Sequence, residues 1–262
     1  MKNKLILGDC IPIMQSMDNE IIDLTVTSPP YDDLRLYDGY SFRMEETVKE
    51  LYRITKKGGV VVWVVGDSVV DGSETLTSFK QALTFKETGF NVHDTMIYHK
   101  SSSSLPDPTR YNQSFEYMFI FSKGKPKTIN KIYDVRNKNA GKPDVGVSIR
   151  EKDGKTYPRQ DRVIPEYSER RNVWTILTGY MHTTKEKFAF QHPAMFPEKL
   201  AKDHILSWSN EGDLVLDPFC GSATTCKMAQ QQSRNYIGIE ISEKYMIIAK
   251  RRMAQTVIQS YQ

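Results

Sequence analysis

Short apolar runs and amphipathic stretches alternate in the first half of this 262-residue chain. Residues 21–27 read IIDLTVT and residues 60–65 read VVVWVV, and such runs are typical of strands buried on both faces of a sheet. Between them, residues 44–57 have apolar positions at helical spacing and end in Lys-Lys-Gly-Gly, which predicts a helix closed by a glycine cap. The same reasoning predicts a helix over 76–88 and strands over 92–98 and 115–121.

The alternation returns after residue 196. Pro197-Glu198 suits the first turn of a helix, because the N–H that proline lacks has no helical partner there. Strands are expected over 214–216 and 236–241, and helices over 224–232 and from Ser242 to about residue 256. A chain in which strands and helices alternate predicts an α/β fold, a mostly parallel sheet with helices on both faces.

The middle of the chain, residues 123–187, follows neither periodicity. Glycine, proline, lysine and asparagine dominate it, so we expect an insertion with long loops between a first part, 1–122, and a last part, 188–262. From Lys123 to Arg171 there are 14 Lys and Arg against 7 Asp and Glu. This excess indicates a polyanionic partner, although a solvated, lysine-rich surface loop explains it equally well.

Composition narrows the class of protein. Hydrophobic residues make up 39% and charged residues 26% of the chain, as is typical of a globular domain. No apolar run reaches the roughly 18 residues of a membrane span, and the N-terminal residues lack the apolar stretch of a secretory signal. Three cysteines and five histidines without metal-ligand spacing predict a cytoplasmic protein with no metal site and no disulfides.

The first candidate site is Ser28-Pro29-Pro30-Tyr31, directly after the strand predicted over 21–27. An exocyclic amino group on a base is a poor nucleophile, because its lone pair is delocalised into the ring. The Ser28 hydroxyl and the Pro29 carbonyl could accept its two hydrogens, held in place by two stiff prolines. Tyr31 offers an aromatic face for a base turned out of the duplex. The alternative is a plain turn with a packed tyrosine.

The second candidate site is the segment 214–225, LVLDPFCGSATT. A strand, a glycine loop and a helix N-terminus form a nucleotide-type site at the carboxyl edge of a parallel sheet. Gly221 would let the backbone approach a ligand, and Glu240, 23 residues after Asp217, is placed to accept hydrogen bonds from ribose hydroxyls. The spacing is not G-x-G-x-x-G, which counts against a dehydrogenase. Alone, the segment could be an ordinary strand, turn and helix.

Together the two segments resemble the amino-directed DNA methyltransferases with the circularly permuted, β-type motif order. In that family a [DNS]PP[YF] motif comes first and a DPFxGSGT cofactor loop comes last, as Ser28–Tyr31 and Asp217–Thr224 do here. Leu7-Gly8-Asp9 resembles the element that contacts the cofactor adenine, with Asp9 accepting from its amino group. Residues 192–198, HPAMFPE, resemble the motif that lines the site around the methionine end of the cofactor, and Arg171–Trp174 resembles the segment before it.

The resemblance implies a Rossmann-like, S-adenosylmethionine-dependent methyltransferase fold, with target recognition in the insertion over 123–187. It also implies S-adenosylmethionine as cofactor, duplex DNA as substrate and a cognate restriction endonuclease as a candidate partner. The catalytic residues that it implies are Ser28, Pro29, Pro30 and Tyr31. The cofactor-binding residues that it implies are Asp9, Cys10, Phe196, Asp217, Pro218, Phe219, Gly221, Ser222, Thr224, Glu240 and Ile241.

The first position of the catalytic motif bears on the target base. In the family, Ser-Pro-Pro-Tyr goes mostly with cytosine N4 and Asp-Pro-Pro-Tyr mostly with adenine N6, so cytosine N4 is the predicted target and adenine N6 the alternative. Methylation at cytosine C5 is not expected, because the chain has no Pro-Cys pair. Ala223 replaces the usual second glycine of the loop. Two further alternatives are methylation of a protein glutamine, whose family runs the motifs in the opposite order, and a DNA-binding homologue without activity.

Overall fold

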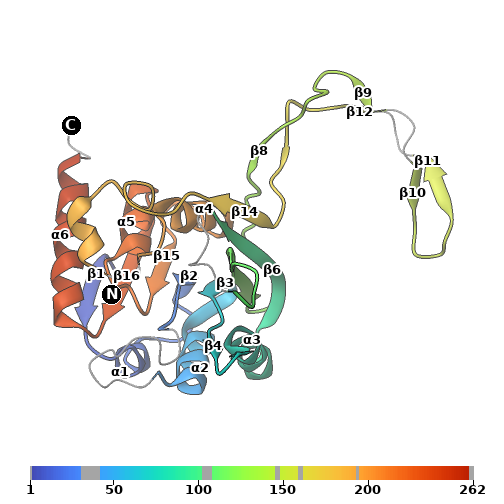
Figure 1. Cartoon of the computed structure of the whole chain (residues 1–262). Helices are drawn as coiled ribbons and strands as arrows, with labels where there is room; N and C mark the ends of the chain where they lie inside the picture. The colour runs from blue at the N-terminus through green and yellow to red at the C-terminus, as the bar shows by residue number, and fades with distance from the viewer. Residues whose placement is uncertain are drawn as a thin grey trace. The chain divides into compact units, whose positions relative to one another are not determined.

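The structure is a computed structural model that describes residues 2–30, 42–101, 108–144, 148–158, 162–192 and 195–259. The chain divides into two compact units (Figure 1). We call Met1–Asn130 with Asn172–Gln262 the body, and Lys131–Arg171 the insert. The insert is narrower than the range 123–187 expected from the sequence, because residues 123–130 and 172–187 pack with the body.

Among the residues that the structure describes, the body has a sheet of eight strands in the order β1-β16-β15-β2-β3-β7-β6-β14. Neighbouring strands run parallel, except that β7 is antiparallel to both β3 and β6. The carboxyl ends of seven strands and the amino end of β7 therefore meet along one edge, which we call the carboxyl edge. In sheet order the strands are β1 (Lys4–Leu7), β16 (Asn235–Glu240), β15 (Leu214–Asp217), β2 (Ile22–Thr27), β3 (Thr55–Val65), β7 (Phe115–Ser122), β6 (Asn91–Lys100) and β14 (Val173–Ile176).

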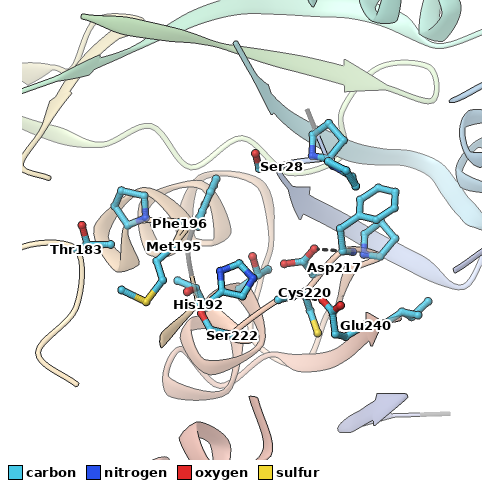
Figure 2. A pocket seen from close by; sticks show the side chains of 18 of the residues that line it. Ser28, Thr183, His192, Met195, Phe196, Asp217, Cys220, Ser222 and Glu240 are labelled. Atoms are coloured by element: carbon cyan, nitrogen blue, oxygen red, sulfur yellow. Dashed lines mark hydrogen bonds between the residues drawn. The ribbon is translucent and has the colours of Figure 1, made fainter. Parts of the chain in front are cut away.

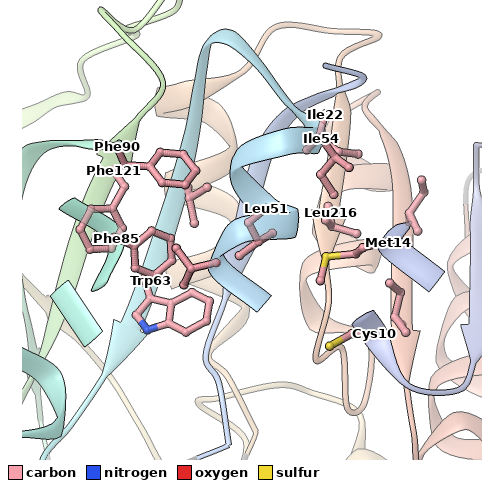
Figure 3. Close-up of a cluster of buried hydrophobic side chains, with 14 of the residues drawn as sticks. Cys10, Met14, Ile22, Leu51, Ile54, Trp63, Phe85, Phe90, Phe121 and Leu216 are labelled. Atoms are coloured by element: carbon pink, nitrogen blue, oxygen red, sulfur yellow. The ribbon is translucent and has the colours of Figure 1, made fainter. Parts of the chain in front are cut away.

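Helices cover both faces of this sheet. Trp63 of β3 packs with residues of α1, α2 and α3 in one buried apolar cluster (Figure 3). The neighbouring Val64 points to the opposite face, as does its cross-strand partner Met118. There α4 packs, with Nε2 of His204 lying 3.1 Å from Sδ of Met118. The helices are α1 (Cys10–Gln15), α2 (Met44–Ile54), α3 (Thr77–Thr88), the 3-10 helix η1 (Lys187–Gln191), α4 (Glu198–Trp208), α5 (Thr224–Gln231) and α6 (Glu243–Gln259).

One predicted boundary is wrong. The helix expected over 44–57 ends at Ile54, and the next residue has extended backbone and begins β3. Strand β3 pairs with β2 there, and Nζ of Lys56 lies 2.8 Å from a carboxylate oxygen of the buried Asp23. The second glycine, Gly59, lies within β3, and a Cβ there would be only 2.9 Å from the Lys56 carbonyl oxygen, so the strand has no room for a side chain at this position. Strand pairing and a buried ion pair therefore override the local pattern of a glycine-capped helix.

The other elements predicted from periodicity are confirmed. Helix α3 ends at Gly89, whose φ of 115° provides the left-handed cap. Three short elements of the body, β1, α1 and β14, were not predicted, because their four, six and four residues are too few to show a clear period. No helix in the described part of the chain is long and apolar enough to cross a bilayer.

The insert is a set of nested antiparallel strand pairs and not a plain loop. Most of its side chains are exposed, so short backbone ladders and surface ion pairs hold it together. Arg162 pairs with Asp144, and Arg170 with Asp134, each joining one side of the ladder to the other. The pairs are β8 (Tyr133–Arg136) with β13 (Tyr167–Glu169), β9 (Pro143–Asp144) with β12 (Arg162–Val163), and β10 (Ser148–Arg150) with β11 (Thr156–Pro158).

Candidate active site

Three functional segments meet at the carboxyl edge of the sheet. Strand β2 ends at Thr27, β15 at Asp217 and β16 at Glu240, and these strands are neighbours. The residues that follow β2 and β15 line one cavity of about 390 Å³ (Figure 2). This volume lies within the usual range of small-molecule sites, and parallel sheets bind ligands at this edge. The two motifs, almost 190 residues apart in sequence, thus form a single site.

Asp217 joins the two motifs. It is buried, and its Oδ1 accepts hydrogen bonds from Thr27 Oγ1 at 2.7 Å and from the Phe219 N–H at 3.1 Å. Burial raises the pKa of Asp217 to about 6, although the bonds from Thr27, Phe219 and Thr225 oppose this rise. The carboxylate fixes the start of the loop after β15 against the end of β2, next to Ser28.

Glu240 holds the other side of the same loop. Its Oε2 accepts from the Gly221 N–H at 2.8 Å and its Oε1 from the Ser242 N–H at 2.8 Å. Burial raises its pKa as well. Each carboxylate oxygen has a second lone pair for a ligand hydroxyl. Gly221 has a φ of 51°, and a Cβ there would lie 2.7 Å from Nε2 of His192, so only glycine fits.

Ala223 holds the position where the family usually has glycine. Its φ of 62° is left-handed, a conformation that costs a non-glycine residue about 1–2 kcal/mol. Arg252 of α6 stabilises the residues on either side. Its Nη1 donates to the Ser222 carbonyl oxygen at 3.2 Å, to Ser222 Oγ at 3.1 Å and to Thr224 Oγ1 at 2.7 Å.

A buried ion-pair network surrounds Arg252, whose side chain is 0% exposed. Its Nε lies 2.5 Å from Glu186 and its Nη2 lies 2.5 Å from Glu198. Lys227 lies 3.0 Å from Glu186 and 2.8 Å from Glu198. The network therefore connects α4, α5, α6 and the chain before η1 directly beneath the loop. Sequence reasoning missed it, because its members are spread over about 70 residues without a shared motif.

The structure brings together nearly all the site residues inferred from the sequence. Tyr31 lies outside the described residues, as do two members of the segment 192–198. Asp9 is described but does not line the cavity. It caps α1 by accepting from the Ile11 N–H at 3.0 Å, and it forms an ion pair with Arg43. The predicted residues that do line the cavity are Cys10, Ser28, Pro29, Pro30, Phe196, Asp217, Pro218, Phe219, Gly221, Ser222, Thr224, Glu240 and Ile241.

Five further residues, from strands β6 and β7 and from the chain between β14 and η1, line the cavity. None of them was predicted as a site residue. Nζ of Lys100 lies 2.5 Å from Oε1 of Glu116. Burial raises the pKa of Tyr98, which therefore stays a neutral phenol. The five residues are Tyr98, Lys100, Glu116, Thr178 and Thr183.

The cysteines at the site are buried thiols. Burial raises the pKa of Cys10 to about 12. Contact with the Cys226 thiol, and then burial, raises the pKa of Cys220. A thiolate nucleophile needs a lowered pKa, so these side chains do not serve as one. Within the described ranges, no group of His, Cys, Asp and Glu could hold a metal ion.

Comparison with known proteins decides the family. The DNA methylase model for N6 and N4 methyltransferases matches residues 22–251. The chain belongs to this family. Orphan methyltransferase M.BamHII of Bacillus amyloliquefaciens is 59% identical over 254 residues, which cover 96% of this chain and 92% of that protein. The protein is therefore an S-adenosylmethionine-dependent DNA methyltransferase that acts on exocyclic amino groups.

Two solved structures share its fold. TTHA0409 of Thermus thermophilus, complexed with S-adenosylmethionine, aligns over 97% of this chain and 95% of its own, with a TM-score of 0.63 and 24% identity. The PvuII DNA methyltransferase, which is cytosine-N4-specific, aligns over 96% and 86% respectively, with a TM-score of 0.67 and 22% identity. The Rossmann-like methyltransferase fold expected from the sequence is thus confirmed. Membership of the DNA methylase family supports S-adenosylmethionine as the cofactor.

Proposed function

We propose that this enzyme methylates the N4 amino group of cytosine in duplex DNA. The observation that carries the proposal is the position of Ser28-Pro29-Pro30, directly after β2 on the wall of the cavity that also holds the cofactor loop. The hydrogen bond from Thr27 to Asp217 fixes this motif relative to the loop. A serine at the first motif position favours cytosine N4 over adenine N6.

The motif can activate an amino group without an acid or base of its own. The Ser28 hydroxyl and the Pro29 carbonyl accept the two amino hydrogens, which draws the nitrogen towards tetrahedral geometry and directs its lone pair at the methyl donor. The prolines keep these acceptors preorganised. Tyr31 stacks on the extruded base in this proposal. Direct transfer needs no covalent enzyme intermediate, and much of the acceleration comes from holding the two reactants in contact.

The cavity fits the cofactor, because two buried carboxylates lie next to apolar walls. When bound, S-adenosylmethionine supplies an electrophilic sulfonium methyl group. Glu240 would accept from the ribose hydroxyls, with Phe219 and Ile241 beside the adenine and Phe196 at the methionine end. Asp9 forms an ion pair with Arg43 and does not line the cavity. The neighbouring Cys10 does line it, so we assign the contact with the cofactor adenine to Cys10 instead.

We propose that duplex DNA is the substrate and that the insert recognises the target sequence. Its two-stranded ladders carry exposed tyrosines and cations such as Tyr133, Arg136 and Arg150. A two-stranded ribbon of this kind fits the major groove of B-DNA, where base edges are read. A cognate restriction endonuclease stays a prediction. The relative M.BamHII is named an orphan methyltransferase, which favours activity without one.

The target base is tested by product analysis. The enzyme is expressed in a host without its own DNA methylation, and the DNA is digested to nucleosides and identified by mass and retention. N4-methylcytosine is the expected product. N6-methyladenine as the sole product would overturn the cytosine assignment and support the adenine alternative with the same mechanism.

Ser28→Ala tests the catalytic motif. Removing one acceptor of the amino group should lower turnover strongly while S-adenosylmethionine affinity stays near the wild-type value. Equal turnover in both proteins would exclude this role for Ser28. Wild-type protein that binds DNA and cofactor without forming either product would instead support an inactive, DNA-binding homologue.

A further inference from the structure

An ion pair lies on the cavity wall on the far side of the catalytic motif from the cofactor loop. Lys100 is the last residue of β6, and Glu116 is the second residue of β7. Their side chains are 33% and 16% exposed, and Nζ lies 2.5 Å from Oε1. Both residues line the same cavity as Ser28. The pair is therefore open to a ligand that reaches the motif.

The order of the strands divides the carboxyl edge into two halves. The loop after β15 and Glu240 at the end of β16 lie on one side of β2, whereas β3, β7 and β6 lie on the other. Strands are about 4.8 Å apart, so the ends of β2 and β7 are separated by roughly 10 Å. The part of the cavity between Ser28 and the ion pair thus lies on the side of β2 away from Asp217 and Glu240.

Glu116 holds a fixed position from which it can orient Lys100. Glu116 on β7 lies opposite Tyr98 on β6 in the strand register. Its Cγ packs over Gly66, 3.3 Å from the point where a Cβ would be. A lysine ammonium group has three donors. Among the described residues one donor serves Glu116, which leaves two for a ligand in the cavity.

The edge of the extruded base supplies an acceptor that distinguishes the two candidate targets. Cytosine and adenine both present an amino group and then a ring nitrogen. The next position is a carbonyl, O2, in cytosine and a C–H, at C2, in adenine. Enzymes that extrude a base read this edge by hydrogen bonding, and a cationic donor strengthens such a bond. A lysine opposite the motif can therefore bind cytosine in a way that adenine cannot match.

We propose that Lys100 determines the target base by donating a hydrogen bond to O2 of the extruded cytosine, and that Glu116 positions its ammonium group. This inference rests on the proposed cytosine N4 activity. It predicts that the enzyme discriminates against a target base with a weakened O2 acceptor only when Lys100 is present. A structural ion pair, or a lysine that contacts a DNA phosphate, would not produce that dependence.

The test combines one atom of the base with one side chain. The modified site is first mapped by sequencing DNA from the expression host. Two duplexes are then made, with cytosine or 2-thiocytosine at the target, since sulfur is a much weaker acceptor and the amino group is unchanged. The kcat/KM of wild type, Lys100→Met and Lys100→Arg is measured on both. Lys80→Met, at an exposed position of α3, is the matched loss of one positive charge.

Wild type should prefer cytosine over 2-thiocytosine by about 10-fold to 100-fold, the range for a hydrogen bond from a charged donor. Lys100→Met should lose this preference, Lys100→Arg should keep part of it, and Lys80→Met should keep all of it. S-adenosylmethionine affinity should be equal in all four proteins.

Three results would overturn the inference. The first is a wild-type enzyme that does not distinguish the two bases, a measurement that needs no variant. The second is an equal preference in wild type and Lys100→Met. The third is a loss of activity on both duplexes together with a weaker salt dependence, which would make Lys100 a phosphate contact. Failure of the proposed function appears separately, as N6-methyladenine in the wild-type product analysis.

Discussion

Charged side chains serve different purposes in the body and in the insert. In the body, Arg252 and Lys227 are 0% and 8% exposed and are enclosed by two carboxylates beneath the cofactor loop. In the insert, Lys131 pairs with Glu169 while the two side chains are 53% and 47% exposed. Buried pairs fix a structure, because losing one partner leaves an uncompensated charge, whereas exposed pairs contribute little to folding.

The basic segment read from the sequence is divided between these two regions. Lys123 belongs to the body, where Nζ donates to the carbonyl oxygens of Tyr52 at 2.8 Å and Thr55 at 3.0 Å. Lys127 forms an ion pair with the buried Asp23. These two lysines stabilise the body. Apart from the exposed Lys125, the exposed cations that remain to account for a polyanionic partner lie in the insert, from residue 131 onward.

The largest effect is expected at Arg252. Arg252→Met should lower the free energy of unfolding by about 3–5 kcal/mol, because Glu186 and Glu198 would lose a buried partner. Urea unfolding measures this. The matched control is Arg251→Met, which removes an exposed arginine 4.2 Å from the Phe188 ring and should cost less than about 1 kcal/mol. Equal losses in the two variants would contradict the contrast between buried and exposed charge.

The next effect is a pH dependence at Asp217. The pKa of this carboxyl is about 6 in the folded protein, against about 3.9 in an unfolded chain. Between these pH values the folded state binds more protons, so this residue's contribution to stability is present below about pH 4 and lost as the pH rises through 6. Its size is about 3 kcal/mol, at 1.36 kcal/mol for each pH unit.

Asp217→Asn removes that titration. The stability of the variant relative to wild type should therefore rise between pH 4 and pH 7, as measured by urea unfolding at several pH values. The raised pKa of Glu240 leaves a smaller dependence of the same sign in both proteins. A difference between variant and wild type that does not change with pH would show that Asp217 is not responsible.

The third effect concerns the cofactor. Glu240→Ala or Asp217→Ala should weaken S-adenosylmethionine binding by roughly 1–3 kcal/mol, because a buried polar group of the ligand or loop loses its partner. Calorimetry measures the affinity, with Glu87→Ala on the exposed side of α3 as control. Unchanged affinity in both site variants would remove these residues from the cofactor site.

Substitutions in the insert should have the smallest effect on stability. They should instead change the salt dependence of DNA binding. Arg136→Gln with Lys138→Gln should change the free energy of unfolding by less than about 0.5 kcal/mol. A plot of the logarithm of the DNA-binding constant against the logarithm of salt concentration should become less steep, its slope falling by about 0.9 for each phosphate that the variant no longer neutralises. Lys127→Gln should do the reverse, lowering stability and leaving the salt slope unchanged. An unaltered slope in the insert variant would indicate a solvated surface.

The sequence alone determined the longer elements of the body and the two motifs of the site. The strands over 21–27 and 60–65 are short apolar runs, and Ser28-Pro29-Pro30 and Asp217–Gly221 follow the predicted strands directly, so local pattern and position predict them. Because strands that alternate with helices align in parallel, their carboxyl ends share an edge. The meeting of the two motifs follows from that rule, and the structure confirms it for the described residues.

Only the tertiary structure decided which charged residues bind each other and where β3 begins. Arg43 pairs with Asp9 across 34 residues, Lys100 with Glu116 across the connection between two strands, and Arg252 with Glu186 across 66. Such partners are chosen by the order of strands in the sheet and by burial, and neither leaves a periodic trace in the chain. A charge count treats Lys127 and Arg136 alike, although both are exposed, because only the folded structure places Lys127 against the buried Asp23 and Arg136 on a strand of the insert.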